Sequence, residues 1–179
     1  MEILRIVVTG SVGAGKSTLI RTISEIDVVD TDKRATDEMA ELKANTTVAL
    51  DFGRLTIGAK QSLHLYGTPG QTRFDFMWDI LLEKAHAYIL LVDAHRPEHF
   101  RYSRKILHYF NQRASIPYLI GLTHTDCPGA WEAEDVALSL GLLDDVENLP
   151  IINVNATEPA SVREALLTLV EQFARCISV

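Results

Sequence analysis

The segment Gly10-Ser-Val-Gly-Ala-Gly-Lys-Ser17 constrains this chain more than any other part of its sequence. It follows a short apolar run at residues 3–8, which is typical of a buried strand, and it leads into a helical spacing of apolar residues over 16–26. A glycine-rich loop between a strand and a helix directs successive backbone N–H groups at one anion. The pattern therefore predicts a phosphate-binding loop within an α/β fold.

Each residue type in this loop has a physical reason to be there. Gly13 and Gly15 lack a Cβ, so the backbone can approach a phosphate closely. We expect Lys16 to reach the β- and γ-phosphates and the Ser17 hydroxyl to bind Mg²⁺. The residues that we expect to surround the phosphates are Val12, Gly13, Ala14, Gly15, Lys16, Ser17 and Thr18.

Strand patterns and helix patterns alternate along the rest of the chain. Apolar runs at 48–57 and 62–66 flank a turn and predict an antiparallel hairpin, and residues 27–46 form a long acidic loop. We expect further strands at 88–92, 118–122 and 150–154, and helices at 72–85, at 97–113 and around 162–173. The alternation predicts one domain over 1–179, a six-stranded mixed sheet with one antiparallel edge strand and helices on both faces.

The composition restricts the classes of partner. The net charge of −7 argues against nucleic acid, which requires a basic surface. No apolar run approaches the roughly 20 residues of a membrane helix, so we expect no integral membrane association. Two cysteines form no disulfide framework, which suits a reducing cytoplasm.

The remaining motifs resemble those of the Ras-like small GTPases. Thr46-Thr47 ends the acidic loop and resembles the end of switch I, about residues 27–47. Gly67-Thr-Pro-Gly70-Gln71 resembles the start of switch II, about residues 67–78. The resemblance implies that Thr47 binds Mg²⁺, that the Gly70 N–H contacts the γ-phosphate and that Gln71 orients the attacking water.

Two later segments resemble the base-binding loops of the same family. Thr123-His-Thr-Asp126 stands where small GTPases carry Asn-Lys-x-Asp, and it implies contacts from Thr123, His124 and Asp126. The Asp126 carboxylate accepts two hydrogen bonds from guanine, and adenine lacks those donors. Asn155-Ala156-Thr157 matches the last base-contacting loop, where the Ala156 N–H would meet guanine O6.

The sequence departs from the Ras pattern at three places. Gly67 replaces the aspartate that holds Mg²⁺ through water, and we hypothesise that Asp51 supplies this carboxylate; a solvated strand aspartate is the alternative. Val12 replaces a glycine and would crowd an inserted arginine, which predicts slow hydrolysis and a different kind of activator. Thr123 and His124 replace the asparagine and lysine, which predicts weaker affinity for the nucleotide.

The motif details resemble a prokaryotic branch of these GTPases, whose bacterial members include gliding-motility polarity GTPases associated with roadblock-type proteins. That resemblance implies a cytoplasmic switch that binds GTP or GDP with Mg²⁺, hydrolyses GTP slowly and signals to regulatory or effector proteins. Two alternatives stay open: a P-loop kinase of nucleotides or metabolites, and a GTP-binding scaffold without hydrolysis. Arg101, Arg104, Lys105 and His108 form a basic stripe, either a solvated face or a partner site.

Overall fold

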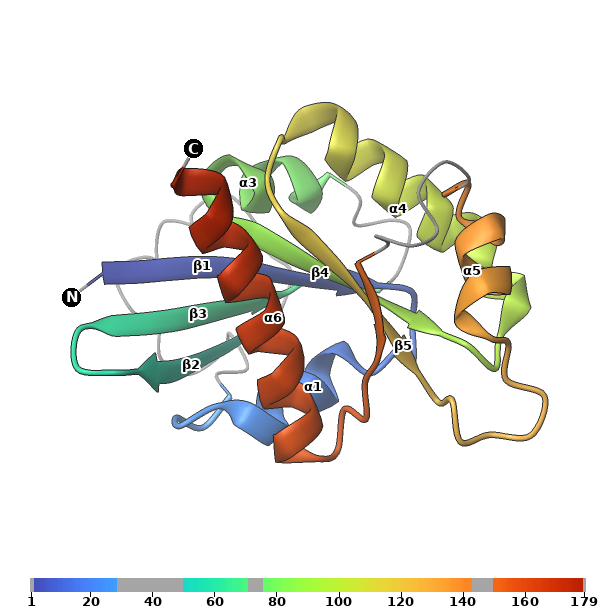
Figure 1. The fold of residues 1–179 in the computed structure, drawn as a ribbon, viewed down its shortest axis with the longest axis horizontal. Helices are drawn as coiled ribbons and strands as arrows, with labels where there is room; N and C mark the ends of the chain where they lie inside the picture. Colours follow the sequence, from blue (N-terminus) through green and yellow to red (C-terminus); the bar gives the residue numbers. More distant parts are fainter. Residues whose placement is uncertain (1, 29–49, 71–75, 143–149, 179) are drawn as a thin grey trace.

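The computed structural model describes residues 2–28, 50–70, 76–142 and 150–178. Its centre is a six-stranded sheet with the strand order β2-β3-β1-β4-β5-β6 (Figure 1). The strands are β1 (Glu2–Gly10), β2 (Asp51–Ile57), β3 (Gln61–Gly67), β4 (Ala87–Asp93), β5 (Tyr118–Thr123) and β6 (Ile151–Asn153). The β2–β3 pair is antiparallel, and the four other pairings are parallel. The predicted mixed α/β sheet with one antiparallel edge strand is confirmed.

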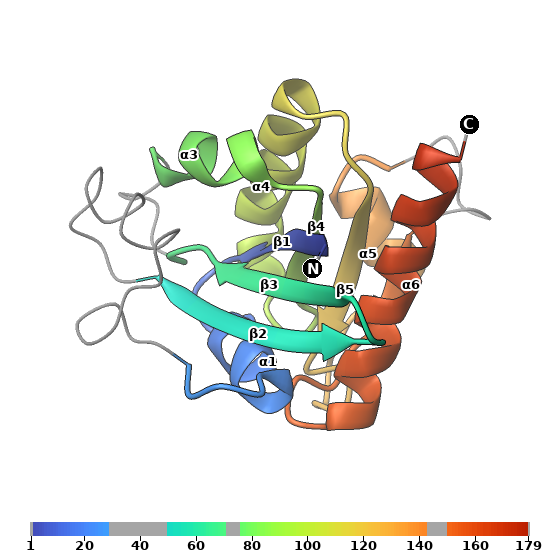
Figure 2. The same cartoon turned by 90° about the vertical axis from the view of Figure 1, so that its left-hand side faces the viewer.

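Helices cover both faces of this sheet, as predicted (Figures 1 and 2). One apolar cluster joins the sheet to α1 (Lys16–Ile23) and α6 (Pro159–Ile177). The other joins it to α3 (Met77–Lys84), α4 (Phe100–Arg113) and α5 (Ala133–Ser139). Strands β1 and β4 contribute to both clusters because they lie between the two helical layers, and every residue of β4 is buried.

Parallel pairing places the carboxyl ends of β1, β3, β4 and β5 at one edge of the sheet. The loops after these strands therefore meet there, as is general for ligand sites in open α/β sheets. In the antiparallel hairpin, Asp51 lies opposite Gly67, so the first residue of β2 reaches the same edge. This edge carries the phosphate-loop sequence.

Several element boundaries differ from the predictions. Helix α1 ends at Ile23 because Ser24 has an extended backbone. The region predicted as a helix at 97–113 begins with a 3-10 turn, η2 (Pro97–His99), before α4. Strand β2 starts at Asp51 within the predicted run 48–57, and α3 spans Met77–Lys84 of the predicted 72–85; residues 48, 49 and 72–75 of these two predictions lie outside the described ranges.

Helix α5 was not predicted at all. It has seven residues, and its buried residues are Val136 and Ala137, so it gives little periodic apolar signal. In the described part of the chain, no helix is both long enough and apolar enough to span a membrane.

Candidate nucleotide-binding site

The phosphate loop runs from the end of β1 to the start of α1, and two glycines fix its path. Gly10 has φ +146°, and a Cβ there would lie 2.3 Å from the Leu91 carbonyl oxygen of the neighbouring strand. Gly15 has φ +104°, and a Cβ there would lie 3.2 Å from the Ala156 Cβ. The chain passes so close to β4 and to the loop after β6 that only glycine fits without a shift of these neighbours.

Lys16 lies almost entirely buried beneath this loop. Its Nζ donates hydrogen bonds to the Gly10 and Ser11 carbonyl oxygens, at 2.8 and 2.6 Å. Burial lowers the pKa of Lys16 to about 8, although the nearby Asp51 carboxylate acts in the opposite direction. Burial thus destabilises the charged form of the Lys16 ammonium under the loop, and a bound phosphate would stabilise that charge.

The chain after β3 lies against the same loop. A Cβ on Gly70 would lie 2.9 Å from the Lys16 Nζ and 2.9 Å from the Val12 backbone nitrogen. The Thr68 N–H donates to the Val8 carbonyl oxygen at 2.9 Å, and the Thr68 hydroxyl donates to Thr9 Oγ1 at 2.9 Å. These bonds hold Gly70 beside Lys16. Thr47 and Gln71, the other predicted phosphate-side residues, lie outside the described ranges.

Asp51 lies opposite Gly67, the position at which the Ras pattern has an aspartate. The Ser17 hydroxyl donates a hydrogen bond to Asp51 Oδ2. Opposite it on β3, a Cβ on Gly67 would lie 2.9 Å from Ile20 Cδ1 and 3.1 Å from the Asp51 Cβ. The space for a side chain at residue 67 is therefore taken up by Ile20 and Asp51. A hydroxyl beside a carboxylate is the oxygen donor set that suits Mg²⁺, so these residues fit that ion.

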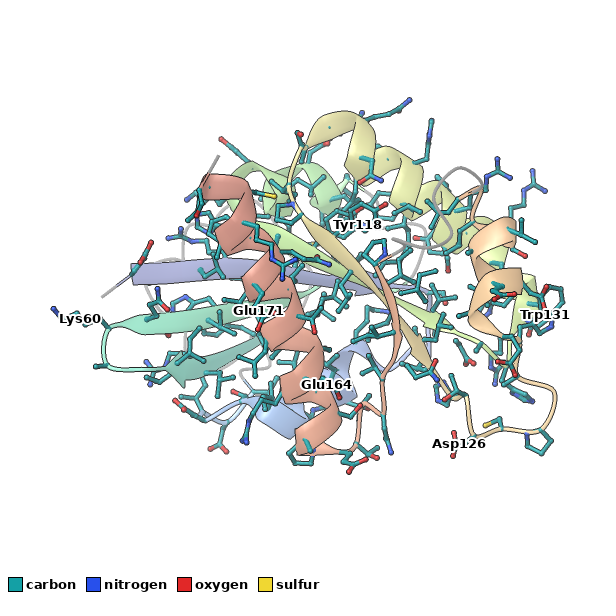
Figure 3. The ribbon with its side chains drawn as sticks, in the orientation of Figure 1. Lys60, Tyr118, Asp126, Trp131, Glu164 and Glu171 are labelled. Atoms are coloured by element: carbon teal, nitrogen blue, oxygen red, sulfur yellow. The ribbon has the colours of Figure 1, made fainter. Side chains whose placement is uncertain are left out.

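The base end of the site is formed by the loops that follow β5 and β6. A cavity of about 340 Å³ lies between these loops and the start of α1. Asp126 lies on the long loop after β5 (Figure 3). The residues that line the cavity are Gly15, Thr18, Thr123, His124, Thr125, Asp126, Val154, Asn155, Ala156 and Thr157. The structure thus gathers all six predicted base-loop residues around one cavity that begins at the phosphate loop.

Thr123 connects the two ends of the site. Its buried hydroxyl donates to the Ala14 carbonyl oxygen at 2.8 Å, which ties the loop after β5 to the phosphate loop. A second tie runs from α1, where the Thr22 hydroxyl donates to the Ala156 carbonyl oxygen at 2.7 Å. The sequence analysis missed Thr22, because a threonine inside a helix gives no signal of such a contact.

His124 is held by a buried carboxylate. His124 has φ +56°, and among the described non-glycine residues no other has a positive φ. Its Nδ1 lies 3.3 Å from Asp93 Oδ2 and 3.2 Å from Thr123 Oγ1. Asp93 ends β4 with 3% of its surface exposed, and its Oδ1 also accepts from the His95 N–H at 3.0 Å. The imidazole therefore has a fixed place beside the cavity.

The loop after β6 is shaped by its own side chains. Asn155 Oδ1 accepts hydrogen bonds from the Thr157 N–H at 3.1 Å and from the Thr157 hydroxyl at 2.7 Å. The Asn155 N–H donates to Ser161 Oγ at 2.9 Å, which fixes the loop to α6. These bonds form an Asx turn around Ala156, whose N–H is the predicted donor to the base.

A family model described as "Conserved hypothetical ATP binding protein" matches residues 26–179. The chain belongs to this family. An uncharacterized protein of Methanocaldococcus jannaschii is 33% identical over 123 residues, which cover 69% of this chain and 71% of that protein. The part of the chain that the ATP-binding family model matches begins after α1, so the phosphate loop lies outside it.

Two further proteins are similar to the chain. ADP-ribosylation factor-like protein 8b of Arabidopsis thaliana is 30% identical over 99 residues, and this match spans about half of each protein, 54% of the chain and 53% of the relative. The Trypanosoma brucei Arl6 BBS3 small GTPase, solved with the nucleotide analogue GppNp, superimposes with a TM-score of 0.69 at 19% identity. That alignment covers 97% of this chain and 98% of the trypanosome protein, and it shows a shared Ras-like P-loop fold.

Proposed function

We propose that this protein is a guanine-nucleotide switch that binds GTP and GDP with Mg²⁺ and hydrolyses GTP slowly. The observation that carries the proposal is the cavity of about 340 Å³ that extends from Gly15 and Thr18 to Asp126 and Ala156. One end of this cavity is a phosphate-binding loop, and the other end offers a carboxylate and a backbone N–H. A site with these two ends suits a nucleotide.

The polarity of the base end favours guanine over adenine. The Asp126 carboxylate offers acceptors, and guanine offers two adjacent donors, N1–H and N2–H₂. Adenine has an acceptor at N1 and would face the carboxylate unfavourably. The Ala156 N–H is a donor, which suits guanine O6 and opposes the amino group of adenine. Because the family description names ATP, an adenine-nucleotide protein is the second candidate.

The phosphate end supplies the groups that hydrolysis requires. Lys16 would leave the Gly10 and Ser11 carbonyl oxygens for the phosphates and stabilise the charge that develops in the transition state. Ser17 and Asp51 would hold Mg²⁺, with Thr47 as a further proposed ligand; when bound, the ion neutralises phosphate charge. The Gly70 N–H would contact the γ-phosphate, and Gln71 would orient the water.

Val12 is the reason that we expect slow turnover. The residue is 55% exposed and its backbone lies beside Gly70, where an activator would have to place an arginine near the γ-phosphate. A β-branched side chain there would exclude such an arginine. We therefore propose activation by another route, with roadblock-type proteins among the candidate regulators of a cytoplasmic, prokaryotic switch. Loss of the γ-phosphate would release Thr47 and Gly70, which lets a partner distinguish the two states.

The experiment that tests the proposal first identifies the nucleotide that copurifies with the protein, by chromatography after denaturation. We expect GDP, and a preference for GDP over ADP in calorimetric titration. Asp126→Asn should lose at least about tenfold in GDP affinity and gain affinity for the xanthine nucleotide, since an amide donates where guanine also donates. Asp135→Asn on α5 is the matched control, since Asp135 lies outside the cavity.

Copurified ADP or ATP, or unchanged selectivity of Asp126→Asn, would overturn the guanine assignment. Single-turnover hydrolysis of GTP by the purified protein then separates a switch from a scaffold. A complete absence of GDP formation over hours would reject the enzymatic part of the proposal.

A further inference from the structure

Helix α4 differs in charge from the rest of the molecule. Its 14 residues include Arg101, Arg104, Lys105 and Arg113 and no aspartate or glutamate. The whole chain has a net charge of −7, so the other 165 residues together carry −11. A helix of four cations on an acidic protein is a local reversal of sign, and such a field attracts anionic groups.

Three of these cations lie on the outer face of the helix, together with His108. Arg101, Arg104, Lys105 and His108 are exposed and follow the i, i+3, i+4, i+7 spacing of one helical face. The opposite face is buried against the sheet by Phe100, Ser103, Ile106, Leu107 and Phe110. Figure 3 shows nitrogen-tipped side chains that project from α4 on the side away from the sheet. We call Arg101, Arg104, Lys105 and His108 the basic face.

The neighbours of the basic face are aromatic. The Lys105 ammonium lies 5.8 Å from the ring centres of both Trp78 and Tyr102, at cation–π distance. Arg113, outside the basic face, is already compensated by Asp79 at 2.9 Å. Within the described ranges, neither Arg101 nor Arg104 has a carboxylate at ion-pair distance.

We propose that the basic face of α4 is a docking site for an acidic segment of a partner protein. Three features favour this occupant over a nucleic acid or a membrane. The stripe from Arg101 to His108 is only about 10 Å long at the rise of an α-helix, which suits a short segment. The −11 charge of the remainder would repel an extended polyanion. Lys105 lies beside the partly exposed ring of Tyr102, and tyrosine is enriched in protein-binding hot spots.

The docking site lies where it would be connected to the nucleotide site. Helix α3 packs beside α4 (Figure 2) and begins within the segment 67–78 that resembles switch II. At the start of α4, His99 Nδ1 lies 3.3 Å from the Ser11 hydroxyl of the phosphate loop. A regulatory role of the docked partner therefore rests on the proposed function, whereas the docking itself does not depend on which nucleotide is bound.

The test uses the full chain with its copurified nucleotide and a short poly-glutamate peptide as the probe. We expect the peptide to shift the NMR amide signals of α4, and to bind more weakly as salt concentration rises. Arg101→Glu/Arg104→Glu/Lys105→Glu should weaken binding at least about tenfold. The matched control Arg54→Glu/Lys60→Glu/Arg163→Glu changes the net charge equally at exposed sites off α4 and should bind as the wild type does.

Equal loss of binding in the control variant would overturn the proposal, because the effect would then belong to overall charge. Tighter binding of phosphatidylserine vesicles or of poly-uridine RNA than of the peptide would also overturn it, as would no peptide binding at low salt. If circular dichroism shows that the triple variant is unfolded, Arg101→Gln/Arg104→Gln preserves Lys105 and should still weaken binding. Because no arm of the test measures nucleotide preference, its failure leaves the proposed guanine switch unaffected.

Discussion

The two ends of the nucleotide site are built from different parts of the chain. At the phosphate end, the contacts that we propose come mainly from the backbone, and Gly10 and Gly15 have no space for a Cβ. At the base end, the proposed contacts come mainly from side chains, and Thr123 and His124 stand where the related pattern has asparagine and lysine. Thr123 nevertheless donates to the Ala14 carbonyl oxygen at 2.8 Å.

This difference explains which motifs are easy to recognise in the sequence. Where the backbone itself must pass within contact distance of a neighbour, only one residue type fits, and the letters of the pattern stay unchanged. Where a side chain delivers an atom, any residue whose atom reaches the same point is acceptable. Asp51, if it binds Mg²⁺ as we propose, extends this rule to the phosphate end, because it would act through its side chain and it lies on a different strand from the expected aspartate.

The largest expected effect concerns Asp51. Asp51→Ala should lower the Mg²⁺-dependent part of the GDP affinity by about 10- to 100-fold, since Ser17 then loses the carboxylate beside its hydroxyl. Gly67→Asp alone should not add a ligand, because its Cβ would lie 3.1 Å from the Asp51 Cβ and the two side chains would compete for the same space. The exchange Asp51→Gly/Gly67→Asp should recover part of the loss. Mn²⁺ binding followed by electron paramagnetic resonance measures the site directly.

The control for this prediction is Asp135→Ala, which removes an exposed carboxylate far from Asp51. Unchanged Mg²⁺ dependence in Asp51→Ala would show that the aspartate is a structural partner of Ser17 and nothing more.

A smaller effect is expected at the base end. Thr123→Val preserves the shape of the side chain but leaves the Ala14 carbonyl oxygen without its donor, which should weaken nucleotide binding about tenfold. Because this bond braces the loops and does not touch phosphate, the factor should be the same for GMP, GDP and GTP. Titration calorimetry with the three nucleotides checks this, with Thr168→Val on α6 as the control.

A loss that grows with the number of phosphates would contradict the separation of the two ends. It would show that Thr123 acts through the phosphate loop.

The smallest expected effect is a pH dependence that belongs to the phosphate end alone. The pKa of Lys16 is lowered to about 8 by burial, and a bound phosphate would raise it again. Above pH 8 the free protein loses this proton and must take it up on binding, so affinity falls as pH rises. Between pH 7 and 8.5 the GDP affinity should fall about fourfold. Lys16→Ala should bind GDP weakly and without this pH dependence. A pH dependence that persists in this variant would assign the proton to another group.

Much of the fold could be predicted from the sequence, because the apolar runs of the strands are short, regular and separated by amphipathic helices. The alternation in chain order leaves few arrangements other than a parallel sheet with one hairpin. Helix α5 could not be predicted, because it is short and buries only Val136 and Ala137. The end of α1 at Ile23 is set by the extended backbone of Ser24, to which the apolar periodicity is insensitive.

The candidate site, like the fold, has features that could be predicted from the sequence and features that could not. The positions of the phosphate loop and of both base loops follow from their places at strand ends. The link between Asp93 and His124 depends on two strands being neighbours, and the bond from Thr22 to Ala156 depends on the contact between α1 and the loop after β6. Such links join residues far apart in the chain and leave no local pattern.

The pairing of Asp51 with Gly67 has a consequence for how relatives of this protein diverge. A side chain at residue 67 and the aspartate at residue 51 would compete for one volume beside Ile20, so we expect substitutions at the two positions to be coupled. If Asp51 supplies the carboxylate as we propose, a search for an aspartate at the end of the third strand would overlook proteins built in this way. A search for an aspartate one strand further out, opposite a glycine, would recover them.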